Sequence, residues 1–163
     1  MKISYEAARA AQNDTGLRQA FLSQIDLEKA RRFIAEVVYC PTTDHNHLMA
    51  TNPTSRAKWG CPGERSTIEV FPNAFQLYKY EDGFKSVLID HEGKHAEDIF
   101  ENPNRIIMTA RNALFICCTQ RRENLREVRA IRNQLTAHAL GTRNLQESHI
   151  HVLEHDLRLF LGK

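Results

Sequence analysis

The spacing of apolar residues along the chain predicts a protein that is mostly helical. Apolar side chains recur every three or four positions, with good helix formers between them, over four stretches. These stretches are residues 16–38, about 83–100, about 104–140 and roughly 144–161. The third is expected to form one long helix, or two that break near Thr119–Arg121. Proline disfavours helical backbone at the residue before it, so Asn102–Pro103 ends the second stretch, and Gly141 closes the third.

A smaller amount of sheet is predicted between the first two helical stretches. The segment STIEVF, residues 66–71, alternates in the manner of a strand and is stopped by Pro72. A short strand could also begin within Val37–Cys40. Residues 41–66 are rich in proline, glycine and polar side chains, which predicts a long loop with room for short strands. The expected fold class is therefore α+β, mostly α.

Length and composition are those of a single soluble domain spanning residues 1–163. The net charge of +2 gives no support to binding of nucleic acid or of a membrane surface. No apolar run approaches the ~18 residues that a membrane helix needs. The cysteines, Cys40, Cys61, Cys117 and Cys118, form no C-x-x-C pair. We expect reduced thiols, no nucleic-acid or membrane partner, and a cytoplasmic protein, although export without a signal peptide remains open.

The segment LIDHEGKHAEDIF, residues 88–100, places two histidines four positions apart on a predicted helix. Phe84, Leu88, His91, His95 and Ile99 follow one another at spacings of 4, 3, 4 and 4, which puts both imidazoles on the apolar stripe. Residues i and i+4 share a helix face, so both rings can reach one Zn²⁺. A solvated face with chance histidines is the competing interpretation, but two buried imidazoles at this spacing favour a metal.

Glu92, directly after His91, points to the side of the two histidines on a regular helix. From there it can reach a metal-bound water without being a ligand, as a general base requires. Asp98, three residues after His95, could hydrogen-bond the second nitrogen of that ligand. The alternative interpretation is that Asp98 is a solvated helix residue with no role at the site.

HEGKH, followed 32 residues after His95 by EVRAIRNQ, resembles the gluzincin metallopeptidases, especially the small single-domain kind. Those proteins carry a metal-binding glutamate in an E-x-x-A context on a second helix, often with a glutamine further along. Glu127, Ala130 and Gln134 match that pattern one by one. The resemblance covers about residues 66–138. It implies His91, His95 and Glu127 as ligands of one Zn²⁺, Glu92 as catalytic base and Gln134 as a supporting residue; Glu123 is the second choice for the third ligand.

The resemblance also implies a zincin-like fold, in which an edge strand lies beside the active-site helix. The strand at 66–70 would then bind an extended peptide through Ile68, Glu69 and Val70. The implied activity is hydrolysis of a peptide or protein substrate by a Glu-activated, metal-bound water. No downstream Tyr or His has an assigned place as transition-state stabiliser. His138 is the candidate on the Glu127 stripe, with a helix-end histidine satisfied by carbonyls as its alternative.

Three other functions fit the same motif. The chain could be a catalytically inactive zincin-like protein that binds a partner, or a secreted effector or toxin protease. It could also hold a structural metal closed by a fourth ligand. Gly93, inside the motif, is a poor helix former, and its lack of a side chain would allow another backbone segment to pack closely against the helix. His151 and His155, also four apart, have no third ligand in phase and are expected to be solvated.

Overall fold

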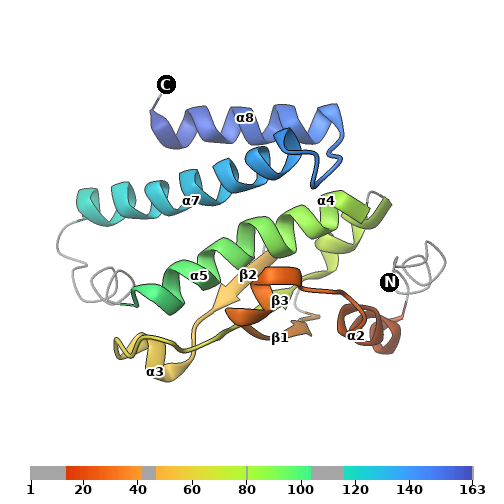
Figure 1. The fold of residues 1–163 in the computed structure, drawn as a ribbon, viewed down its shortest axis with the longest axis horizontal. Helices are drawn as coiled ribbons and strands as arrows, with labels where there is room; N and C mark the ends of the chain where they lie inside the picture. Colours follow the sequence, from red (N-terminus) through yellow and green to blue (C-terminus); the bar gives the residue numbers. More distant parts are fainter. Residues whose placement is uncertain (1–13, 42–46, 80, 104–115, 163) are drawn as a thin grey trace.

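The computed structural model describes residues 14–41, 47–79, 81–103 and 116–162. Over these ranges the protein is an α+β fold, mostly helical, with a three-stranded sheet (Figure 1). The elements in chain order are α2 (Thr15–Ser23), η1 (Glu28–Arg32), β1 (Ile34–Tyr39), β2 (Met49–Asn52), α3 (Ser55–Lys58), β3 (Ser66–Val70), η2 (Pro72–Lys79), α4 (Glu81–Lys85), η3 (Ser86–Glu92), α5 (Gly93–Glu101), α7 (Ile116–Ala139) and α8 (Glu147–Leu161).

The first predicted helix is much shorter than residues 16–38. Asp14 caps α2, where its Oδ1 accepts hydrogen bonds from the backbone N–H groups of Gly16 and Leu17 at 2.7 and 3.0 Å. The helix ends at Ser23, and the chain becomes strand β1 from Ile34. The prediction of helix over 24–38 was wrong because IAEVVY is rich in β-branched residues, which favour a pleated strand once a neighbouring strand is present.

The sheet has the strand order β1-β3-β2, so β3 is its central strand. β3 runs parallel to β1 and antiparallel to β2. A strand at 66–70 is confirmed, but its expected position at the edge of the sheet was wrong. Both sides of β3 are paired, and Ile68 and Val70 are fully buried in the main core. The edge strand beside the helix with the histidines is β2, inside the region predicted as a loop.

The helix predicted over 83–100 is confirmed as a continuous run of α4, η3 and α5 that ends at Glu101, before Asn102–Pro103. Its middle, η3, is π-helical. A π-helical turn holds more residues than an α-helical turn, and such turns often occur at functional sites. His91 and Glu92 lie in η3, whereas His95 lies in α5, so the motif spans the change from π to α geometry.

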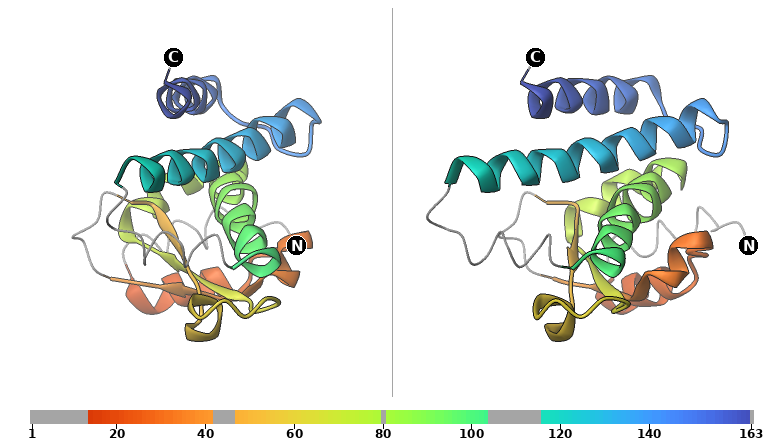
Figure 2. Two further views of the ribbon diagram at one scale, coloured as in Figure 1. Left: turned by 90° about the vertical axis from the view of Figure 1, so that its left-hand side faces the viewer. Right: turned by 60° about the vertical axis from the view of Figure 1, so that its left-hand side comes forward.

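Helices α7 and α8 form an antiparallel pair that covers the run of α4, η3 and α5. Figure 2 shows α8 outermost and α7 beneath it, with α5 and the sheet next to each other below α7. α7 is unbroken from Ile116, and Gly141, at φ +71°, closes it as predicted; residues 104–115 of that prediction lie outside the described residues. Ile131, Leu145 and Leu153 form a second apolar cluster between α7 and α8. Among the described helices, none is both long and apolar enough to cross a membrane.

Candidate metal centre

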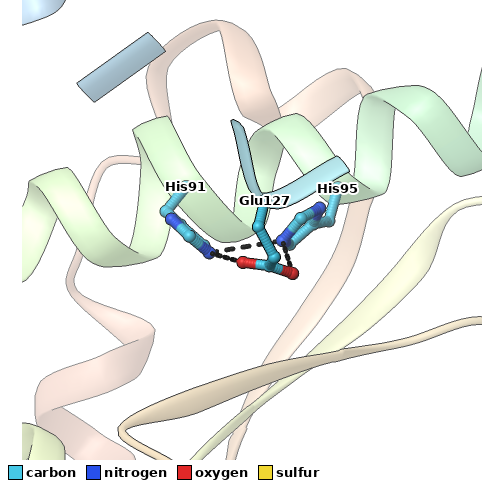
Figure 3. Close-up of side chains that lie close together, drawn as sticks. All are labelled: His91, His95 and Glu127. Carbon is cyan, nitrogen blue, oxygen red and sulfur yellow. Dashed lines mark hydrogen bonds and ion pairs between the residues drawn. The ribbon is translucent and has the colours of Figure 1, made fainter. Parts of the chain in front are cut away.

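The continuous run of α4, η3 and α5 is called the motif helix below. Three of the predicted site residues meet where α7 crosses it. His91 and His95 project from neighbouring turns of that helix, and Glu127 reaches them from α7 (Figure 3). The Nε2 atoms of the two histidines are 3.2 Å apart. Oε2 of Glu127 lies 3.2 Å from His91 Nε2, and Oε1 lies 3.2 Å from His95 Nε2. The structure therefore brings together two ring nitrogens and a carboxylate from parts of the chain more than 30 residues apart.

These separations fit a shared metal ion. Ligands held at 2.0–2.1 Å from Zn²⁺ at tetrahedral angles lie about 3.3 Å from one another. The 3.2 Å between the two Nε2 atoms is close to this tetrahedral edge, and each Nε2 lies 3.2 Å from a different oxygen of Glu127. One ligand atom from each of the three residues can be chosen within 4.8 Å of the others. Small adjustments of the side chains would suffice to bind an ion, and the three-residue set leaves a fourth position for water or substrate.

The carboxylate of Glu127 is strongly coupled to the two imidazoles. Burial by itself would raise the pKa of Glu127, but hydrogen bonds from His91 and His95 outweigh it and hold that pKa well below its ordinary value. Burial would lower the pKa of His91, yet the hydrogen bond to Glu127 and the charges of Glu92 and Glu127 raise it overall. Without a metal, the site therefore favours an imidazolium–carboxylate pair, and a cation that binds there replaces a proton.

The second nitrogen of His91 is fixed by α7. Nδ1 of His91 donates to Oε1 of Gln134 at 2.9 Å, and Nε2 of Gln134 donates to Oγ of Ser86 at 2.9 Å. Gln134 and Ser86 are fully buried, with exposed fractions of 1% and 0%. With a hydrogen held at Nδ1, the proton that His91 loses to a metal would be the one on Nε2, which leaves the tautomer that a metal needs. Gln134 thus lies behind His91, one of the three candidate ligands.

Asp98 does not take the place that the sequence predicted for it. It is buried, and its Oδ1 forms ion pairs with Arg129 of α7 at 2.8 Å and with Lys94 at 3.5 Å. The Nδ1 atom of His95 is buried and has no hydrogen-bond partner among the described residues. The prediction that Asp98 orients His95 was wrong because the cations on α7 and α5 hold its carboxylate instead; the alternative of a solvated Asp98 was also wrong.

Glu92 lies beside the three candidate ligands and is hydrogen-bonded to the edge strand. It is 6% exposed, and its Oε2 lies 2.7 Å from the hydroxyl of Thr51 on β2. The same hydroxyl lies 3.0 Å from the carbonyl oxygen of Glu92. The hydrogen bond to Oε2 leaves Oε1 of this carboxylate free to accept a proton. Glu92 is thereby positioned next to the ligands without joining them.

The three candidate ligands and Glu92 line a cleft of about 430 Å³. Its other lining residues come from the approach to β2, from β2 itself and from α7 and α8: His47, Met49, Ala50, Thr51, Glu123, Arg126 and Phe160. This volume is in the range of small-ligand sites. Glu123, the second choice for third ligand, lines the cleft but lies outside the group of three that can share one ion.

Four other predicted site residues are placed away from this cleft. Ile68, Glu69 and Val70 do not line it, because β2 separates the central strand β3 from it. Their assignment to substrate binding was wrong for that reason.

His138 lies at the end of α7, eleven residues after Glu127, which is about 16 Å of helix rise. Its Nδ1 accepts from the backbone N–H of Leu145 at 3.2 Å and lies 3.2 Å from the carbonyl oxygen of Arg143. The catalytic assignment of His138 was wrong, since the side chain holds the turn after α7 and is not among the cleft residues.

Sequence patterns gave no indication of a buried ionic cluster behind the motif helix. Arg143, in the turn after α7, donates from Nε to Oδ2 of Asp90 at 3.0 Å. It also donates from Nη1 and Nη2 to the two carboxylate oxygens of Glu28, at 3.2 and 2.9 Å. Burial raises the pKa of Asp90 to about 6, in spite of the opposing charge of Arg143. The cluster fixes the residue before His91 to both α7 and η1.

Thr51 and Phe160 were also missed as cleft residues. A weak signal existed for Thr51, because it directly follows Leu48–Ala50, the only run of three consecutive apolar residues in the 41–66 region. Nothing in the spacing of α8 indicated that Phe160 would reach the cleft.

Comparisons with protein-family models, with curated proteins and with solved structures found no match to this chain.

Proposed function

We propose that this chain is a zinc-dependent peptidase with a zincin-like arrangement, of the gluzincin type. The observation that carries the proposal is the convergence of His91 Nε2, His95 Nε2 and the Glu127 carboxylate at mutual distances of 3.2 Å. Two neutral imidazoles and one carboxylate are a ligand set of catalytic zinc sites. When bound there, the ion would acidify water and polarise a substrate carbonyl.

The residues of this chain would divide the remaining work among them. His91, His95 and Glu127 bind the ion, and Gln134 keeps the imidazole of His91 in the required tautomer. Glu92 accepts a proton at Oε1 from the water that adds to the peptide carbonyl carbon, while Thr51 holds Oε2. The same proton then passes to the peptide nitrogen as the C–N bond breaks, which yields a carboxylic acid and an amine.

The edge strand β2 is the proposed binding place for the substrate backbone. β2 pairs with β3 on one side only, and Met49, Ala50 and Thr51 line the cleft. An extended peptide can add to such an edge through main-chain hydrogen bonds. The scissile bond would then lie between Thr51 and the three metal ligands.

Metal content tests the first half of the proposal. The purified protein, exposed to zinc and washed, should hold about one zinc per chain by mass spectrometry, and Glu127→Ala should lose it. Glu123→Ala is the matched control, because Glu123 lies one turn away on the same helix and lines the same cleft. A metal-free wild type would overturn the proposal, and zinc lost from Glu123→Ala but not from Glu127→Ala would reassign the ligand.

Hydrolysis tests the second half. The zinc-loaded protein should release new amino groups from a degenerate peptide mixture, and Glu92→Gln should abolish that release while it keeps the zinc. Equal release by both proteins would remove Glu92 as the base. Zinc binding without any release would favour a structural metal or a partner-binding protein.

A further inference from the structure

The cleft carries one cationic side chain that the proposed chemistry does not use. Arg126 lies directly before Glu127 on α7, is half-buried and lines the cleft. Within the described ranges its guanidinium has no hydrogen bond or ion pair. Arg129, one turn further along the same helix, differs in this respect because it pairs with Asp98. An unpaired guanidinium in a cleft wall is available to a ligand.

The position of Arg126 directs it to the substrate more than to the metal. Successive residues of an α-helix are separated by about 100° around its axis, so Arg126 leaves α7 well away from the direction of Glu127. It lines the same cleft as Met49 and Ala50 of the edge strand and Phe160 of α8. It therefore belongs to a wall of the cleft along which a peptide side chain or terminus would lie.

We propose that Arg126 selects substrates that present a carboxylate next to the scissile bond. The carboxylate could belong to an Asp or Glu side chain or to the free C-terminus of the peptide. A guanidinium offers two parallel N–H donors that match a carboxylate, and such charge-assisted pairs are stronger than neutral hydrogen bonds. This inference rests on the proposed peptidase function.

Loss of water from the half-buried Arg126 when a peptide binds would make the cleft selective for carboxylates. A peptide that fills the cleft removes water from Arg126, so a neutral group at that position leaves a desolvated cation without a partner. Sites built around a buried polar group discriminate strongly against ligands that cannot pair with it. An exposed arginine, which keeps its water, would discriminate much less.

The test measures binding by the zinc-loaded Glu92→Gln protein, which should hold peptides without cutting them. The probes are four dye-labelled hexapeptide mixtures, randomised over uncharged residues except for one central residue that is Glu or Gln, each made with a free or an amidated C-terminus. Binding is compared with Arg126→Ala and Arg132→Ala in the same background. Arg132 is the matched control because it is exposed on the same helix and lies outside the cleft.

We expect the carboxylate-bearing mixtures to bind about tenfold more tightly than the neutral mixture, and Arg126→Ala to remove that difference. Arg132→Ala should leave it unchanged. The Glu and free-terminus arms separate the two sources of the carboxylate. Absence of discrimination, absence of binding, or an equal loss for all mixtures in Arg126→Ala would overturn the inference.

Failure of this inference and failure of the peptidase proposal give different results. Hydrolysis by the parent protein without any preference for carboxylates would refute only the role of Arg126. Zinc-dependent, Arg126-dependent binding of acidic peptides without hydrolysis by the parent would refute only the catalytic activity.

Discussion

His91 and Gln134, which are 43 residues apart in the chain, are joined by a hydrogen bond of 2.9 Å from Nδ1 of the imidazole to Oε1 of the amide. Gln134 in turn donates to the buried hydroxyl of Ser86, five residues before His91 in η3. The chain of hydrogen bonds determines which nitrogen of His91 carries the hydrogen. It also links α7 to the motif helix at Ser86, which His91, His95 and Glu127 alone do not reach.

Replacement of Gln134 should weaken zinc binding without removing a ligand. Gln134→Leu leaves Nδ1 of His91 without its acceptor, and loss of such a supporting group typically costs about 10- to 100-fold in metal affinity. Gln134→Glu keeps an acceptor and should retain the affinity. Competition with a chromogenic chelator measures both, with Thr136→Ala, at an exposed position of the same helix, as the control. Unchanged affinity in Gln134→Leu would contradict the role of this hydrogen bond.

Replacement of Thr51 should reduce the rate of hydrolysis and leave the zinc in place. Thr51→Val has nearly the same shape but cannot donate to Oε2 of Glu92, so the buried carboxylate loses its orienting partner. We expect a fall of about tenfold in rate, equivalent to about 1.4 kcal/mol, on the degenerate peptide mixture. Thr51→Ser should stay near the wild type. A loss of zinc content in Thr51→Val would show instead that the edge strand supports the metal site.

The sequence predicted the elements whose periodicity is long and uninterrupted. The helix that carries His91 and His95, the later helices over the residues that the structure describes, and the strand at 66–70 were recovered, because each buries one face against a neighbour and shows the corresponding period. The segment after Ser23 was not, since IAEVVY has apolar residues that fit helical spacing as well as strand alternation. The presence of β3 as a parallel neighbour decided in favour of a strand.

The candidate ligands were predictable because helical spacing and the EVRA context are local signals. Contacts between distant segments were not. No local sequence pattern indicates that β2 lies between β3 and the cleft. None indicates that Arg129 forms an ion pair with Asp98, or that Arg143 forms one with Asp90. These depend on the register of the sheet and on the crossing of α7 over the motif helix, neither of which the pattern of residues specifies.

Gly93 should tolerate alanine but not a larger residue. A Cβ at this position would lie 3.1 Å from Cβ of Ala30, tight enough that the neighbour must shift by a few tenths of an ångström. For alanine, the gain in helix propensity of about 1 kcal/mol offsets this crowding. For Gly93→Val we expect a loss of about 1–3 kcal/mol in the free energy of unfolding by urea. Wild-type stability in Gly93→Val would mean that η1 can move away from α5 at little cost.

The cluster around Arg143 should contribute substantially to stability. Arg143→Ala leaves the buried carboxylate of Asp90 without its cation, and breaking a buried ion pair from one side typically costs about 3–5 kcal/mol. Glu28→Gln should cost much less, because the side chain of Glu28 is 40% exposed. The double variant Asp90→Asn, Arg143→Ala should recover part of the loss. If the double variant were less stable than Arg143→Ala, the buried charge would not be the cause.

The pH dependence of stability should reverse when zinc binds. In the metal-free protein the pKa of His91 is raised above 6.5, so its contribution is fully present below pH 6.5 and is lost as pH rises through the raised value. The pKa of Glu127 is lowered from 4.5, so its contribution is present above pH 4.5 and is lost only in stronger acid. The pair therefore stabilises the metal-free fold most between about pH 4.5 and 6.5.

Zinc acts in the opposite direction, because the ion must displace the proton on His91 and its affinity rises as that proton leaves. The increase in the urea midpoint on addition of zinc should accordingly be small at pH 5.5 and larger at pH 8, measured on the same preparation. Glu127→Gln removes the anion that raises the pKa of His91, and it also removes a proposed zinc ligand. It should therefore abolish the increase in urea midpoint caused by zinc and weaken the pH dependence of stability in the metal-free protein. Glu123→Gln should have neither effect. A zinc effect that is equal at the two pH values would contradict competition between the ion and the proton at His91.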